Sequence, residues 1–265
     1  MTDQLVAETL SRFRAKAAEA GVSSRNVELL ISSFLPAVYP QIGGDGPVVV
    51  HLGGNNPMLP VGTGKPSEPF LCTIDCAQIP PNSTGLPLPA DGHLLLFGDA
   101  EKLGQGPGPG YVVYVPAGTP TTEVPAPEPV RGSYEERDYR SVRVGPSWPS
   151  SGPDGFADPS DDESEMTVED YELMDQLSDI WGEVDGNSFG SDLYLGGHAD
   201  FWNDDPVELA NEYEYGGGND WCLLANWYCD DVVALPLPRM HWLIRRQDLA
   251  DLRFDRVMLS VDMHG

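Results

Sequence analysis

The first forty residues carry two apolar stripes with the roughly 3.6-residue period of an α-helix. Thr2 and Gly21 frame the first stripe as cap and stop signals, and Ser23 or Ser24 and Pro36 frame the second. The two stripes consist of Val6, Leu10, Phe13 and Ala17, and of Val27, Leu30, Ile31 and Phe34. This pattern predicts two helices that pack through these faces.

From Val48 onward, short apolar runs separated by Gly and Pro replace the helical period and favour β-strands. These runs are VVVHL, FLCTID, HLLLF and YVVYV. Between residues 117 and 166 the chain is rich in Pro, Gly and acidic residues, which predicts extended surface loops.

The C-terminal part begins with a third helical stripe, which we expect to start after Thr167 and to end at Gly182. Asp205 and Pro206 then form the start signal of a further helix. The stripe consists of Val168, Tyr171, Met174, Leu177 and Trp181. The later runs WCLLANWY, MHWLIR and RVMLSV are strand-like, and QDLADLRF is typical of a short helical turn.

Three motifs recur in the same order in both parts of the chain. HLGGNNP pairs with YLGGHAD, FLCTIDC with LLANWYC, and GHLLLF with MHWLIR. The pairing sets Thr73 against Asn226, Cys76 against Cys229, and His93 against His241. The repeat predicts an internal duplication.

We therefore expect an α+β fold of two related β-rich units with N-terminal and intervening helices. On this interpretation residues 1–265 form a single domain. Its parts are a helical region at 1–40, a first β-rich unit at 48–116, loops at 117–166 and a second, acidic unit at 167–265.

Five motifs together resemble the YwqG-like family, a bacterial domain of unknown function. They are LGGNNP, PFLCTIDCAQIP, LPADGHLLLFGD, the second LGGH and WLIRRQDLADLRFDRV. The resemblance implies an α+β fold with two related β-rich units and no established reaction. The chain departs from the family at Thr73 and Asn226, where members tend to carry Gln, and at His198-Ala199, where Pro tends to follow the second Gly pair.

Charge is distributed unevenly along the chain. Residues 144–238 contain 23 Asp and Glu and no Lys or Arg, whereas the net charge of the whole chain is −27. A field of this sign repels nucleic acid and anionic membranes and attracts basic partners or cations. No apolar segment has the length of a leader or a membrane helix, so we expect a cytoplasmic protein.

The sequence contains no recognisable catalytic, cofactor or metal motif. The Gly pairs after Leu52 and Leu195 lack the spacing of nucleotide-binding loops. The four cysteines match no common zinc pattern and are expected to be reduced. The acidic runs lack the calcium-loop signature and permit weak calcium binding only. We expect no cofactor, and an enzyme is the less favoured class.

Aromatic residues within the base-free region suggest a binding surface. Interfaces favour Trp, and an acidic rim speeds the capture of a basic partner. The predicted contact residues are Trp202, Asp204, Asp205, Trp227, Asp230 and Asp231. The leading hypothesis is a non-catalytic protein that captures a basic protein, for example an immunity protein that neutralises a toxin.

The alternative hypothesis is an enzyme or small-ligand protein. Its polar pocket would lie between the two units and would use His198, Asp200 and Asn226.

Overall fold

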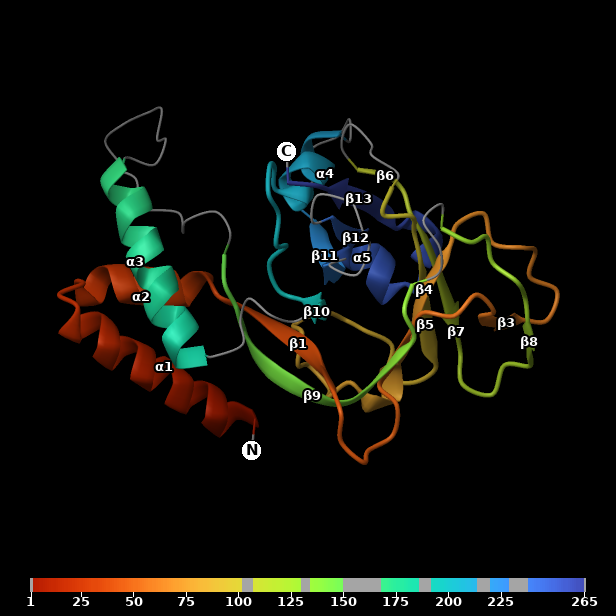
Figure 1. Cartoon of the computed structure of the whole chain (residues 1–265), viewed down its shortest axis with the longest axis horizontal. Coiled ribbons are helices and arrows are strands. Elements are labelled where there is room, and N and C mark those ends of the chain that lie inside the picture. The colour runs from red at the N-terminus through yellow and green to blue at the C-terminus, as the bar shows by residue number, and fades with distance from the viewer. Residues whose placement is uncertain are drawn as a thin grey trace.

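Figure 1 shows a computed structural model in which a layer of helices lies beside a strongly curved β-sheet. The structure describes residues 2–101, 107–129, 134–149, 168–185, 192–213, 220–228 and 238–264. The helices are α1 (Thr2–Glu19), α2 (Ser24–Ser33), α3 (Val168–Asp185), α4 (Pro206–Tyr213) and α5 (Arg246–Ala250), with short 3₁₀ turns η1 (Cys76–Gln78) and η2 (Phe254–Arg256). None of the described helices is both long and apolar enough to cross a membrane.

The strands form one large sheet and one small one. The large sheet contains β1 (Leu35–Ile42), β2 (Val50–Leu52), β4 (Phe70–Asp75), β5 (His93–Phe97), β6 (Gly108–Pro109), β7 (Tyr111–Val115), β9 (Arg137–Ser147), β10 (Leu193–Gly196), β11 (Trp221–Tyr228), β12 (Arg239–Arg245) and β13 (Met258–Asp262). The small sheet pairs β3 (Met58–Pro60) with β8 (Thr121–Glu123).

The large sheet is antiparallel and nearly closed. Its order is β6-β13-β12-β11-β10-β1-β9-β2-β4-β5-β7, and only Gly110 separates the two edge strands β6 and β7 along the chain. The Trp242 indole of β12 donates a 3.1 Å hydrogen bond to the Phe97 carbonyl of β5, which joins the two ends of the sheet. The α+β class expected from the sequence is confirmed.

The helices α1, α2 and α3 pack into a layer with its own core. Phe13, Leu30 and Trp181 are fully buried there, and the Phe13 and Trp181 rings meet edge-on at 5.3 Å. The Ser23 hydroxyl caps α2 by accepting from the Asn26 N–H, as predicted. By contrast, Tyr171 of the predicted stripe is 60% exposed, and α3 continues through Gly182 to Asp185.

The strands β1 and β9 are far apart in the sequence but lie side by side at the centre of the sheet (Figure 1). In sequence, β1 precedes β2 and β9 precedes β10, but the pairing on their outer sides is crossed. β1 pairs with β10, and β9 pairs with β2. Beyond them, β2-β4-β5-β7 form the first half of the sheet and β10-β11-β12-β13 form the second half.

The two halves share their strand register. His51 lies opposite Thr73 in the first half, and Tyr194 lies opposite Asn226 in the second. Both second strands carry a bulge two residues earlier, at Leu71 in β4 and between Leu223 and Ala225 in β11.

The predicted pairing of His93 with His241 is not reproduced by this register. Thr73 faces Leu95, and Asn226 faces His241, so Leu95 is the residue at the position of His241. The predicted loop region 117–166 contains β8 and the whole of a long central strand, β9, while the predicted helical region 1–40 already includes the start of β1.

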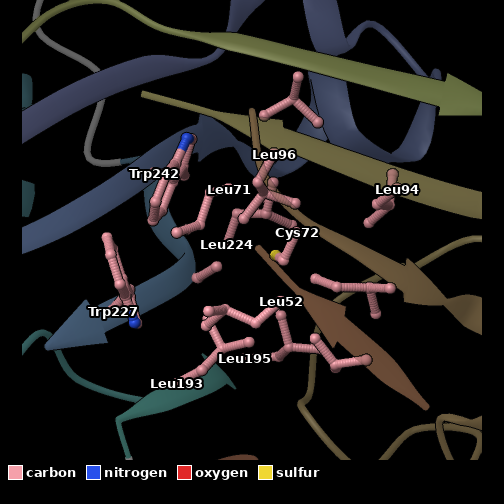
Figure 2. Close-up of a cluster of buried hydrophobic side chains, with 14 of the residues drawn as sticks. Leu52, Leu71, Cys72, Leu94, Leu96, Leu193, Leu195, Leu224, Trp227 and Trp242 are labelled. Atoms are coloured by element: carbon pink, nitrogen blue, oxygen red, sulfur yellow. The ribbon is translucent and has the colours of Figure 1, made fainter. Parts of the chain in front are cut away.

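Apolar side chains from both halves fill the interior of the curved sheet. Figure 2 shows Leu52, Leu193 and Leu224 gathered in the interior, with the Trp227 and Trp242 rings beside them. Leu52, Leu193, Leu224 and Trp242 are almost completely inaccessible to solvent. Polar groups that could bind a ligand therefore have to be sought on the outer wall of the sheet.

Candidate functional site

A row of polar side chains crosses the outer wall of the second half. Tyr194, Asn226, His241 and Ser260 lie directly opposite one another on β10, β11, β12 and β13. All four are buried, with Asn226 1% and His241 0% exposed. Buried polar groups usually have hydrogen-bond partners, so this row requires an account of its contacts.

The segment that follows the second Gly pair covers this row. The Asp200 N–H donates to the Asn226 side-chain oxygen at 3.3 Å, and the Tyr194 hydroxyl donates to the His198 carbonyl at 2.9 Å. His241 Nε2 lies 2.7 Å from the Asp200 carbonyl. Because a carbonyl only accepts, neutral His241 must carry its proton on Nε2.

Among the residues that the structure describes, two atoms of the row find no hydrogen-bond partner. The Asn226 Nδ2 group is a buried donor, and with the proton on Nε2 the His241 Nδ1 atom is a buried acceptor. They belong to residues directly opposite each other on β11 and β12. A small group that both accepts and donates, such as a water or a hydroxyl, would complement this pair.

The same segment and the end of β13 together present an acidic surface. We call it the acidic loop surface and define it as Asp200, Trp202, Asp204, Asp205 and Asp262. Residues 198–208 contain four carboxylates and no Lys or Arg. Trp202 is 38% exposed. The surface therefore combines an accessible indole ring with negative charge.

Arg239 lies beneath this surface and holds it in place. Its guanidinium carbon lies 3.8 Å from the centre of the Trp202 ring, and its Nη2 lies 2.9 Å from the Asp200 carboxylate. Asp262 accepts hydrogen bonds from the backbone N–H groups of Trp202 and Asn203. Burial raises the pKa of Asp200, an effect that Arg239 opposes and Asp262 reinforces.

The comparison with protein families gives a match that spans both halves of the sheet. Residues 51–262 match the family described as a domain of unknown function, DUF1963. The chain belongs to this family. The matched range of the DUF1963 domain begins in β2 and ends in β13, so α1, α2 and β1 lie before it. A search of curated proteins finds no match.

The three residues of the predicted polar pocket are close together in the DUF1963 domain. Asp200 contacts Asn226 as described, and His198 lies two residues before Asp200. His198 Nε2 donates to the Ser33 carbonyl at 2.7 Å, and burial lowers its pKa. His198 therefore links the covering segment to the end of α2. All three residues lie on or over the outer wall, while the space between the halves holds apolar side chains.

The structure brings together only some of the predicted partner-contact residues. Trp202, Asp204 and Asp205 lie together, and Asp205 caps α4 by accepting from the Val207 N–H at 2.8 Å. Trp227 is 2% exposed and packs edge-on against Tyr134 in the interior, so it belongs to the core and not to the surface. Asp230 and Asp231 lie outside the described residues.

Sequence reasoning missed Arg239, Asp262 and the role of His241. Arg239 is the first base after the long base-free region, which is the one signal that could have drawn attention to it. The positions opposite Asn226 depend on strand register, and the bulge in β11 shifts that register. Comparison of the motifs alone therefore cannot identify the residues that lie opposite Asn226.

The corresponding row of the first half borders an open cavity. Thr73 and Leu95 line a cavity of about 340 Å³ together with His93 and residues of the 115–121 turn. Met58 of the small sheet also lines this cavity. In the second half, the segment around Asp200 lies over the equivalent positions.

The described cysteines are free thiols that their surroundings do not activate as nucleophiles. Cys72, Cys76 and Cys222 are free, and burial raises the pKa of Cys76 to about 12 and that of Cys222 to about 11. A nucleophilic cysteine needs a lowered pKa, so these three thiols lack that property. Among the described residues no group of three or more His, Cys, Asp or Glu is placed to hold a metal ion. Cys229 lies outside them.

The burial of His241 predicts a pH dependence of stability. Burial lowers the pKa of His241 to about 4, compared with about 6.5 in an unfolded chain. Between these values the unfolded chain binds a proton that the folded chain does not. The free energy of unfolding should therefore fall as the pH drops from about 6.5 to about 4, by up to about 3 kcal/mol from this residue.

Urea unfolding of the wild type and of His241→Gln at about pH 7 and pH 4.5 measures this effect. Glutamine retains an N–H donor for the Asp200 carbonyl but does not titrate. We expect the variant to lose less stability between the two pH values than the wild type does. Equal losses in both proteins would contradict the assignment.

Proposed function

We propose that this DUF1963 chain is a non-catalytic binding protein whose acidic loop surface captures a basic protein partner. The observation that carries the proposal is the exposed Trp202 ring among Asp200, Asp204 and Asp205. Aromatic side chains at the centre of an interface supply much of its affinity, and surrounding carboxylates attract a positively charged partner. A toxin-neutralising immunity protein is the concrete form of this proposal.

The internal contacts of the acidic loop surface support this role. The Trp202 backbone is tied to Asp262, and its ring is stacked on Arg239. Asp205 is oriented by its cap of α4. A surface already ordered before binding loses little conformational entropy when a partner docks.

The test begins with capture of partners from the native host by the full chain at low salt. The affinity of each purified partner is then compared for wild type, Trp202→Ala and the double variant Asp204→Asn/Asp205→Asn. Asparagine at position 205 can still cap α4. We expect Trp202→Ala to weaken binding at least about tenfold, and the double variant to slow association mainly at low salt.

The matched control is Glu169→Gln/Glu172→Gln, which removes two charges from the exposed face of α3. It should leave the affinity and the association rate nearly unchanged. If no basic partner is captured, or if all variants bind a captured partner equally, the proposal fails.

We further propose that the two halves of the sheet arose by duplication, and that the chain lies within the YwqG-like branch of its family. The shared register at Thr73 and Asn226, and the bulges two residues before each, support the duplication. The five ordered sequence motifs support the YwqG-like assignment.

A second candidate function is the binding of a small polar molecule at the row of the second half. The observation that favours it is the unpaired donor of Asn226 opposite the unpaired acceptor of His241. A hydroxyl-bearing ligand of this site would have to lose affinity in His241→Phe, whose ring offers no acceptor; unchanged affinity would exclude the site.

A further inference from the structure

A groove separates the helical layer from the curved sheet, and we call it the junction groove. Its volume is about 740 Å³, within the range of small-molecule sites. One wall comes from α1 and α2, and the other from β1, β9 and the loop at residues 80–83. The lining residues are Val6, Ala7, Leu10, Ile31, Phe34, Leu35, Pro36, Pro80, Pro81, Asn82, Ser83, Val144, Gly145 and Pro146.

The groove exists because the helical layer and the sheet have separate cores. Phe13, Leu30 and Trp181 anchor the core of the helical layer, whereas Val6 belongs to neither core cluster. Ligand sites occur preferentially where two such bodies meet. Here the meeting place also lies between the matched DUF1963 range and the N-terminal elements before it.

The sheet side of the groove is rigid. Pro36 of β1 lies directly opposite Pro146 of β9, and Pro80 and Pro81 continue the wall. Proline fixes its own backbone φ angle, so four prolines give a wall with few conformations to lose. The groove is therefore largely formed before any ligand arrives.

The groove is uncharged in a strongly charged protein. None of the described residues that line it is ionisable, although the chain contains 42 acidic residues and 15 Lys and Arg. Asn82 and Ser83, which are adjacent, are the only polar side chains in the described part of its lining. Asn82 is exposed, and the Ser83 hydroxyl donates to the Pro80 carbonyl at 2.6 Å, so the carboxamide of Asn82 and the oxygen of Ser83 are the groups that can hydrogen-bond to a hydroxyl or ester head. The described lining offers no charge that could pair with an ionised head.

We propose that the junction groove binds a neutral amphiphile. The alkyl part would lie against Val6, Leu10 and Ile31, and the uncharged polar head would lie at Asn82 and Ser83. This binding site is separate from the acidic loop surface, so either proposal can fail without the other.

Displacement of the neutral dye Nile red from the full chain tests the proposal with three ligands of one chain length. We expect decan-1-ol to displace the dye with a stoichiometry of one. Decanoate and decylammonium should bind at least about tenfold more weakly because their heads are ionised. Equal affinities for the three ligands, or no displacement by decan-1-ol, would overturn the proposal.

Two tryptophan variants on the same helix locate the binding. Val6→Trp fills the groove and should abolish displacement, whereas Leu5→Trp adds the same ring at an exposed position and should leave it intact. Circular dichroism and thermal melting verify that both variants fold. Asn82→Asp should weaken decan-1-ol binding and improve that of decylammonium.

The other possible occupants give distinct results. If the chain dimerises and the dimer dissociates in Val6→Trp, a second copy covers the groove and the proposal is wrong. The proposal is equally wrong if an amphipathic helical peptide displaces the dye and decan-1-ol does not.

Discussion

A Trp242→Ala variant is expected to lose about 3–5 kcal/mol of unfolding free energy. Trp242 is fully buried in the interior of the curved sheet. Its indole also donates to the Phe97 carbonyl across the point where the sheet fails to close. The substitution therefore creates a large cavity and also removes the bond that joins β12 to β5.

Urea unfolding of Trp242→Ala and Trp242→Phe separates these two contributions. Phenylalanine keeps most of the ring volume but cannot donate, so we expect it to cost about 1–3 kcal/mol. The exposed Trp202→Ala should cost less than about 1 kcal/mol. If Trp242→Phe is as damaging as Trp242→Ala, the hydrogen bond and not the packing dominates, and the expected order is wrong.

Alanine substitutions at Gly53 and Gly197 are each expected to cost about 2–4 kcal/mol. Both glycines have a positive φ, 82° and 76°, which alanine adopts only with strain. A Cβ at Gly53 would lie 2.7 Å from the Tyr134 carbonyl oxygen, and one at Gly197 would lie 2.6 Å from the Ser147 Cβ. Ser147 also accepts a hydrogen bond from the His198 N–H, which the added methyl would disturb.

Gly118→Ala provides the matched control. Gly118 has a φ of 77°, but an added Cβ there meets nothing within 4 Å. It should lose about 1 kcal/mol from backbone strain alone. Chemical denaturation of the three variants therefore measures the steric part by difference. Similar losses at all three positions would mean that the close approaches contribute nothing.

The sequence predicts the helices well because their stripes and caps are local signals. Ser23 and Asp205 cap α2 and α4 as expected. The sequence does not predict the central strands β1 and β9, for a different reason in each case. Pro36 and Pro40 argue against a strand in β1, yet the β1–β10 pairing covers only Ala37 and Val38 between them. In β9, Asp138 and Arg140 break the apolar pattern, and they pair with each other there.

The candidate site was only partly predictable. The proximity of Asp200 to Asn226 follows from the order of the repeated motifs, whereas the partner of Asn226 depends on a bulge that no motif reveals. Trp227 was assigned to the surface because an aromatic ring in an acidic region fits either place. Strand alternation around the bulge directs it into the core.

The crossed pairing of the central strands β1 and β9 couples the stability of the two halves of the sheet. Since β1 is held by β10 and β9 by β2, neither half can leave the sheet without breaking the pairing of the other. We therefore expect a destabilising change in one half to be felt throughout the sheet, and the two halves to unfold as one cooperative unit. Selection acting on an acidic surface in the second half is therefore constrained by strands that were contributed by the first.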